Sequence, residues 1–436
     1  MAENDRSLDP PPGQPGGQPG TLFQRVRVFD AERGALTAPA DVLVVGNTIA
    51  RVASAPLAAG PGLTVLDGRG RVLLPGLIDA HWHSMLAAIG LETAVAGDVG
   101  YINLLAAREA GATLRRGFTT VRDAGGPAFA LKRAIDEGVV PGPRIFPSGA
   151  MISQTGGHGD FRMPYEVPRS PGEPLSHSEQ IGATAIADGP DDVRLRAREQ
   201  LRQGASQVKL MAGGGVASPF DPLDVTQYVE SEVRAAVEAA ENWGTYVAVH
   251  AYTPRAIRMA VAAGVRSIEH GHLIDPPTAA LLAEHGVWLC LQPFLDDGDA
   301  PALPDEERRQ KLRQLYDGTD VAYTLARRHG VRVAFGTDIL FDARLAARQG
   351  AQLTKLTRWY TPAEVLTMAT AGNAALLALS GPRNPYPGAL GVVREGALAD
   401  LLLVDGDPLQ DLALLADPEV SLLAIMKDGR LIKNRL

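Results

Sequence analysis

The chain of 436 residues is long enough for one large domain and a smaller companion, with a core that needs no covalent cross-links. Its single cysteine, Cys290, excludes an intrachain disulfide and lies in an apolar run that predicts a buried, inert thiol. The formal net charge is −8 and both signs are mixed along the chain, whereas a nucleic-acid-binding protein shows a basic face or stripe. We therefore expect no nucleic-acid partner.

The sequence also lacks the usual signs of membrane insertion and export. No apolar run reaches the roughly 18 residues that a membrane span needs, and the first residues lack the charged-then-apolar pattern of a signal peptide. We expect no membrane partner and, by default, a cytoplasmic location. A chain from which a secretion signal had been removed would show the same pattern, so secretion stays open.

Both ends of the chain differ in composition from its middle. Residues 1–20 are rich in proline, glycine and glutamine and predict a disordered tail that cannot bury a core. Short alternating apolar runs follow in residues 21–72, with Gly46 and Asn47 as a turn between strands, and similar runs return in residues 385–436. We expect the two segments to form one small β-domain.

In residues 73–384, strand-like apolar runs alternate with amphipathic segments rich in alanine, arginine and leucine. This order predicts repeated βα units around a parallel sheet, and eight such strands would make a (β/α)₈ TIM barrel. Long irregular stretches at about 153–189 and 293–305 predict binding loops at its carboxyl-terminal face. The eight predicted strands end near His83, Asp123, Met151, Met211, His250, His270, Gln292 and Asp338.

Two histidines at the end of the first predicted strand are the first candidate metal ligands. His81 and His83 are separated by one residue, so on a strand both side chains point to the same face while Trp82 points to the other. The pair would aim two imidazoles at one metal ion. Because a spacing of this kind also arises by chance, the assignment depends on what the other strands supply.

Four further residues with metal-binding or base chemistry occupy equivalent positions near other predicted strand ends. They are Lys209, His250, His270 and Asp338. Catalytic groups of barrel enzymes come from the carboxyl ends of the strands. One such residue at one strand end could arise by chance, but such residues at the ends of several strands are much less expected by chance.

Lys209 is the most unusual of these residues, because the chain uses arginine for nearly all of its cations. Inside an apolar strand a lysine amine loses part of its basicity, and the neutral amine can add carbon dioxide to give a carbamate that bridges two metals. The alternative is a lysine paired with a nearby carboxylate.

With these residues in place, the span from about Leu22 to Arg435 resembles the amidohydrolase superfamily. The resemblance rests on the PGLIDAHWH motif at residues 75–83, GFTTVRD at 117–123, the four segments above and GALADL at 396–401. More narrowly, GPRI at 142–145 followed by GGHGD at 156–160 resembles the branch of prolidase-like carboxypeptidases and ochratoxin-hydrolysing amidases.

The resemblance implies a distorted (β/α)₈ barrel and a β-sandwich made by both termini. It implies two divalent metal ions, expected to be zinc, with carboxylated Lys209 between them and Asp338 as the catalytic group that moves a proton. His81, His83 and Asp338 would hold one metal, and His250 and His270 the other. Homo-oligomers are frequent in this family, so we expect one here.

Three residues are candidates for substrate contact. His158, flanked by glycines in the long third loop, could reach over the metals as a catalytic or substrate-binding group. Tyr228 could bind a substrate carboxylate or only cap the following helix. Arg162 is a further candidate for the carboxylate.

The expected function is hydrolysis of an amide that joins an acyl group to a C-terminal amino acid, as in dipeptides, N-acyl amino acids or ochratoxin A. One alternative is a cyclic-amide hydrolase or deaminase of the same superfamily, although deaminases usually use one metal and lack the carboxylated lysine. Another is a non-catalytic binding protein, which the presence of all six candidate ligands disfavours.

Overall fold

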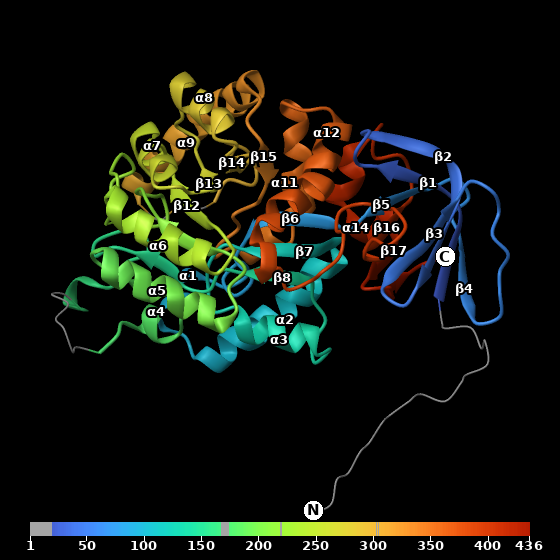
Figure 1. Ribbon diagram of the computed structural model, residues 1–436, viewed down its shortest axis with the longest axis horizontal. Coiled ribbons are helices and arrows are strands. Elements are labelled where there is room, and N and C mark those ends of the chain that lie inside the picture. Colours follow the sequence, from blue (N-terminus) through green and yellow to red (C-terminus); the bar gives the residue numbers. More distant parts are fainter. Residues whose placement is uncertain (1–19, 167–173, 219, 302, 304) are drawn as a thin grey trace, which may run out of the picture.

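The computed structural model describes residues 20–436 except 167–173, 219, 302 and 304 (Figure 1). The predicted disordered tail therefore lies, apart from Gly20, outside the described residues. Three β-sheets run through the described part, one antiparallel in most of its pairings and two fully parallel.

Both ends of the chain build one eight-stranded sheet, on the right in Figure 1. The strand order is β18-β17-β16-β5-β1-β2-β3, with β4 paired to β1. Alternating apolar residues of β1 and β2 fill a core under this sheet. The eight strands are β1 (Gly20–Asp30), β2 (Ala35–Val45), β3 (Thr48–Ala53), β4 (Leu63–Asp67), β5 (Val72–Pro75), β16 (Leu401–Val404), β17 (Leu422–Lys427) and β18 (Arg430–Asn434).

The middle of the chain forms the two parallel sheets, of three and seven strands. Their orders are β6-β7-β8 and β10-β9-β11-β12-β13-β14-β15. The strands are β6 (Leu77–Trp82), β7 (Phe118–Asp123), β8 (Arg144–Pro147), β9 (Met151–Ser153), β10 (Thr184–Ile186), β11 (Val208–Met211), β12 (Val247–Ala251), β13 (Ser267–His270), β14 (Trp288–Leu291) and β15 (Val333–Phe335).

The two parallel sheets meet at two places. The amide of Asp338, just after β15, donates to the carbonyl of His81 in β6 at 2.8 Å, and the amide of Ser206, just before β11, donates to the carbonyl of Pro147 in β8 at 2.7 Å. The first contact brings the ends of β6 and β15 together, where His81 and Asp338 lie, and the second joins β8 to the start of β11.

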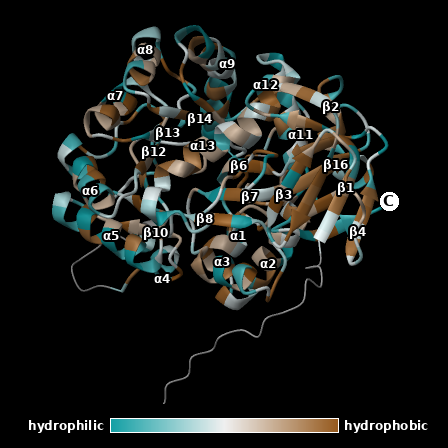
Figure 2. Cartoon of the chain, turned by 45° about the vertical axis from the view of Figure 1, so that its right-hand side comes forward, coloured by the Kyte–Doolittle hydropathy of each residue, from teal (hydrophilic) through white to brown (hydrophobic). Residues whose placement is uncertain are grey.

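Helices cover the outside of the parallel strands, and Figure 2 shows hydrophobic strands inside and hydrophilic surfaces on the outer helices. Buried alanines, valines and leucines of these helices pack on the strands in one large core. The helices are α1 (Leu91–Ala96), α2 (Val99–Arg115), α3 (Phe129–Asp136), α4 (His177–Gln180), α5 (Pro190–Gln203), α6 (Glu230–Asn242), α7 (Pro254–Ala262), α8 (Pro276–Glu284), α9 (Glu306–His329), α10 (Ala343–Ala346), α11 (Gln349–Thr354), α12 (Pro362–Thr367), α13 (Asn373–Leu377) and α14 (Pro418–Ser421).

The local sequence explains where several of these helices begin. α7 and α8 start with proline directly after the capping residues Thr253 and Asp275, whose side chains accept hydrogen bonds from the first turn. α9 is capped by Asp305, whose side chain also accepts a hydrogen bond from the first turn, and it ends at Gly330, which has φ +68°. A side chain rarely adopts that left-handed conformation, so glycine suits the end of the helix.

Two sequence expectations differ from the structure. The single strand predicted to end near Met151 is divided into β8 and β9, which lie in different sheets, because Gly149 between them has φ +76° and breaks the extended run. The stretch expected to be irregular from 153 to about 189 contains α4 and β10. A reciprocal capping pair, Ser176 with Glu179, begins α4 and was the sequence signal for it.

One segment is long and apolar enough by composition to cross a membrane. It runs from Pro362 to Arg383, and half of its most apolar window is buried inside the protein. Within it, the Asn373 side chain donates to the carbonyls of Ile78 and Phe335 and thereby joins the segment to β6 and β15.

Candidate metal centre and active site

His81, His83 and Asp338 come together where β6 meets the end of β15. The Nε2 atoms of His81 and His83 lie 3.1 and 3.3 Å from the same carboxylate oxygen of Asp338, Oδ1. One ligand atom from each residue falls within 4.8 Å of the others. Two imidazole nitrogens and a carboxylate oxygen make a donor set that suits zinc and similar divalent cations, so these residues fit a metal ion.

The other ring nitrogens of this histidine pair have partners that orient the rings. His81 Nδ1 lies 2.8 Å from Glu269 Oε2, and His83 Nδ1 lies 2.8 Å from the carbonyl oxygen of Gly125. If each Nδ1–H donates to its acceptor, each Nε2 is left with a free lone pair that faces Asp338. A second hydrogen bond of this kind is usual for histidines that bind metals.

His250 and His270 lie beside the first group. The ring centroids of His250 and His270 are 4.4 Å apart, and those of His270 and His81 are 5.0 Å apart. His250 Nε2 lies 3.0 Å from the carbonyl oxygen of Gly214, and His270 Nδ1 lies 2.8 Å from Gln292 Oε1. The structure thus places the second predicted pair of histidines next to the first, with one nitrogen of each ring held by a partner.

Lys209, in the middle of β11, is 2% exposed and lines one cavity together with these four histidines. Burial lowers its pKa below the ordinary value, against the opposite effect of the carboxylates Glu269 and Asp338. In the described part of the chain, no hydrogen bond or ion pair reaches its amine. A buried, weakly basic lysine amine meets the requirement for carboxylation.

The remaining ligand candidates are held in the protonation states that bind metals. Burial lowers the pKa of His250 and of His270 well below 6.5, which keeps both imidazoles neutral. Burial raises the pKa of Asp338, but its contacts with His81 and His83 outweigh that effect and hold the pKa well below 3.8. Neutral imidazoles beside an ionised carboxylate are the forms that a divalent cation needs.

The backbone at this site adopts conformations that side chains rarely accept. His270 has φ +82° and Asp338 has φ +52°. Asp79 of β6 contributes to the arrangement, because its carboxylate accepts hydrogen bonds from the amides of His81 and Thr337, both at 3.1 Å, and from the Thr337 hydroxyl at 2.7 Å. Strain of this kind persists only where the surroundings hold it in place.

Asp79 was not identified from the sequence, although it precedes His81 by two residues and therefore shares its face of the strand. Arg122 and Glu269 were also missed. Arg122 Nη2 donates to Glu269 Oε2 at 2.6 Å, and that oxygen also lies against His81. Glu269 directly precedes the candidate ligand His270, and a carboxylate next to a predicted ligand at a strand end is the signal that could have found it.

The structure places His158 beside the candidate metal centre. Its ring stacks on that of His250 with the centroids 4.4 Å apart, and its Nδ1 lies 2.9 Å from Asp221 Oδ2. A Cβ at residue 215 would overlap the His158 ring, so the glycine allows the ring to pack against the backbone there. Asp221 thus orients a buried imidazole at the wall of the cavity.

The structure does not bring the other two predicted substrate contacts into the cavity. The hydroxyl of Tyr228 donates to the carbonyl of Ala187 at 3.0 Å, and Arg162 Nε donates to Asp160 Oδ1 at 2.7 Å. Neither Tyr228 nor Arg162 lines the cavity that contains the histidines. Both side chains instead make hydrogen bonds within the region around the loop that carries His158.

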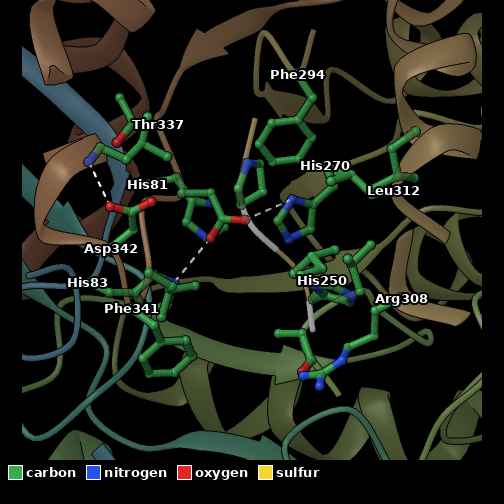
Figure 3. Close-up of a pocket in the computed structure, with 18 of the residues that line it drawn as sticks. His81, His83, His250, His270, Phe294, Arg308, Leu312, Thr337, Phe341 and Asp342 are labelled. Atoms are coloured by element: carbon green, nitrogen blue, oxygen red, sulfur yellow. Dashed lines mark hydrogen bonds and ion pairs between the residues drawn. The ribbon is translucent and has the colours of Figure 1, made fainter. Parts of the chain in front are cut away.

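The cavity in front of the histidines has a volume of about 540 Å³ and would hold a small organic substrate (Figure 3). Its walls come from the loops after β14 and β15 and from the first turns of α9, and most of them are apolar. They include Phe294, Leu312, Leu315, Leu340 and Phe341.

Comparison with known proteins agrees with this geometry. The model of the amidohydrolase family matches residues 72–432. The chain belongs to the amidohydrolase family. The predicted resemblance and the predicted class, a hydrolytic enzyme that acts on amide bonds, are thereby confirmed.

Among individual proteins, this amidohydrolase is 32% identical over 392 residues to the ochratoxinase of Aspergillus niger, a match that covers 83% of the chain and 76% of the relative. It is 37% identical to a prolidase crystallised with N-methylphosphonate-L-proline, with a TM-score of 0.87 and coverage of 95% and 100%. It is 28% identical to a Xaa-Pro dipeptidase with bound methionine, with a TM-score of 0.83 and the same coverage.

Proposed function

We propose that the protein is a binuclear metal-dependent hydrolase that releases a C-terminal amino acid from dipeptides or N-acyl amino acids, with ochratoxin A among the candidate substrates. The observation that carries the proposal is the gathering of His81, His83 and Asp338 with Lys209, His250 and His270 at the base of one cavity. The similarity to an ochratoxinase, a prolidase and a Xaa-Pro dipeptidase supports this class of substrate.

The donor atoms favour two divalent cations, with zinc the best match to imidazole and carboxylate ligands. His81, His83 and Asp338 would hold one and His250 and His270 the other, with Lys209, carboxylated by carbon dioxide, between them. When bound, such cations supply Lewis acidity to the amide carbonyl and increase the acidity of a water molecule.

The side chains themselves have separate tasks in this proposal. Asp338 is ionised and reaches both histidines of β6, so it can take a proton from the attacking water and pass it to the departing amine nitrogen. His158, oriented by Asp221 through Nδ1, lies against His250 and can contact the substrate through its other nitrogen, Nε2. The apolar walls exclude bulk water from the reacting groups.

Release of free amino acid from a panel of substrates tests the proposal. The panel contains Xaa-Pro dipeptides, other dipeptides, N-acyl amino acids and ochratoxin A, each incubated with the zinc-loaded protein. We expect turnover of at least one class, its loss after dialysis against a chelator and its return with zinc. A zinc-loaded protein that hydrolyses no member of the panel would refute the proposal.

Metal content separates this function from that of a one-metal deaminase of the same superfamily. We expect about two metal ions per chain, and Lys209→Ala should lose metal and reduce kcat/KM by a factor of about 100 or more. Lys209→Ala with full activity, or one metal per chain in the active wild type, would contradict the bridging role. A protein that binds substrates but turns none over would instead favour a binding function.

The same proposal treats the two parallel sheets as one distorted (β/α)₈ barrel and the sheet from both termini as part of a β-sandwich. The two hydrogen bonds that join the sheets, at His81 and Pro147, support closure of the barrel. A homo-oligomer is part of the proposal too, and light scattering of the purified protein would test it.

A further inference from the structure

Three cationic side chains are among the described residues that line the cavity. Lys209 belongs to the metal centre. Lys355 is held between two carboxylates, because its Nζ lies 2.9 Å from Asp297 Oδ2 and 3.4 Å from Asp299 Oδ2. Arg308 is the remaining cation, and its surroundings leave part of the guanidinium available.

Arg308 belongs to the first turn of α9. Its Nε lies 2.5 Å from Asp305 Oδ2, and its Nη1 donates to the carbonyl of Ala217 at 3.2 Å. Over the described residues, its Nη2 makes no hydrogen bond. Asp305 also caps α9 by accepting a hydrogen bond from the amide of Arg308 at 2.8 Å, so the carboxylate fixes both the backbone and the side chain.

A short loop connects Arg308 to the metal centre. The carbonyl of Gly214 contacts His250, Gly215 packs on the ring of His158, and the carbonyl of Ala217 accepts the hydrogen bond from Arg308. Three residues of chain span at most about 10 Å, so the guanidinium lies within reach of a small substrate bound at His250. Figure 3 shows Arg308 on the same side of the cavity as His250.

The helix that carries Arg308 also supplies an apolar wall. Arg308, Leu312, Leu315 and Tyr316 recur at spacings of three or four residues, which places them on one face of α9, and all four line the cavity. A molecule bound there would meet a planar cation and apolar side chains along the same helix. That combination suits an amino acid that carries a carboxylate and an apolar side chain.

We propose that Arg308 binds the α-carboxylate of the substrate and so makes the enzyme selective for amides of free amino acids. The inference rests on the proposed function and assigns to Arg308 the role that the sequence suggested for Arg162 or Tyr228. A guanidinium suits it better than an ammonium, because its parallel N–H groups match the two oxygens of a carboxylate.

A matched pair of substrates tests the proposal. One is an N-acyl-L-phenylalanine, and the other is the same acyl amide of 2-phenylethylamine, in which hydrogen replaces the carboxylate. Zinc-loaded wild type, Arg308→Gln, Arg308→Lys and the control Arg313→Gln are compared. Arg313 is half-exposed on the same helix, pairs with Glu306 and does not line the cavity.

We expect Arg308→Gln to lower the ratio of kcat/KM between the two substrates by about 10- to 100-fold, mainly through KM, because a charge-assisted hydrogen bond is lost. Arg308→Lys should recover part of the ratio, and Arg313→Gln should not change it. Binding of free L-phenylalanine, measured by calorimetry without turnover, should weaken in parallel. An unchanged ratio in Arg308→Gln, or an equal loss with both substrates, would overturn the role of Arg308.

The result distinguishes this inference from the proposed function. If the wild type hydrolyses the amide panel but Arg308→Gln leaves the ratio unchanged, only the assignment of Arg308 fails. If the zinc-loaded wild type hydrolyses no amide at all, the proposed function fails, and the selectivity inferred for Arg308 fails with it.

Discussion

The buried ion pair between Arg122 and Glu269 offers the sharpest test of how the fold supports the site. Both side chains are at most 1% exposed, and Arg122 Nη2 lies 2.6 Å from Glu269 Oε2. The other oxygen of Glu269 accepts a hydrogen bond from the Ser267 hydroxyl at 2.6 Å. We expect Glu269→Gln, which keeps the shape of the side chain and removes its charge, to destabilise the protein strongly.

The size of the effect follows from burial. Glu269→Gln leaves the guanidinium of Arg122 with its full charge in a site that water does not reach, and an unpaired charge of this kind costs about 3–5 kcal/mol. Arg122→Met removes the opposite partner and should cost a similar amount. The double variant leaves neither charge, so it should be more stable than the sum of the two single effects by about 1–3 kcal/mol.

Urea unfolding of the metal-free proteins, followed by circular dichroism and tryptophan fluorescence, measures these free energies. Wherever the two signals coincide, the midpoints and slopes give the four free energies of unfolding. A cost below about 1 kcal/mol for Glu269→Gln, or strict additivity in the double variant, would refute the reasoning. In the metal-loaded state, loss of the negative charge beside His81 in Glu269→Gln should also weaken metal binding about 10- to 100-fold.

Two further variants test other parts of the structure. Gly215→Ala places a Cβ 2.1 Å from Cε1 of His158, so the imidazole must move, and we expect kcat/KM to fall about 100-fold. The control Gly90→Ala, whose Cβ meets nothing within 4 Å, should leave kcat/KM unchanged. Burial raises the pKa of Asp428, but the hydrogen bond from Arg144 outweighs it and holds the pKa below 3.8. A carboxyl whose pKa is lower in the folded protein than in the unfolded chain stabilises the fold at any pH above its pKa in the unfolded chain. Asp428→Asn should therefore lower the urea midpoint at pH 7, and the difference in midpoint between wild type and variant should shrink as the pH falls below 3.8. A difference that grows instead would contradict this.

Local patterns accounted for most of the strands and for the pairing of His81 with His83. Successive side chains of a strand alternate between its faces, so two histidines one residue apart must point the same way wherever the strand lies. The ends of most predicted strands agree with the structure to within a few residues. The exception near Met151 arose because an apolar run does not reveal a break caused by one glycine, Gly149.

The structure was needed for every contact between residues far apart in the chain. Tyr228 and Arg162 have residue types that bind carboxylates, yet hydrogen bonds within their own region hold both outside the cavity. Arg308 is one of many arginines in the sequence and has no distinguishing pattern there. Only the packing of α9 against the loop at Ala217 brings its guanidinium to the cavity wall.

The sequence by itself therefore determined the chemical types at the strand ends, because a strand repeats every two residues and a parallel sheet gathers its carboxyl ends at one edge. The tertiary structure decided which charges meet. Arg122 reaches Glu269 across 147 residues of chain, and Asp79 reaches Thr337 across 258. Such pairs depend on how whole strands and helices pack, and no pattern within a single element encodes that packing.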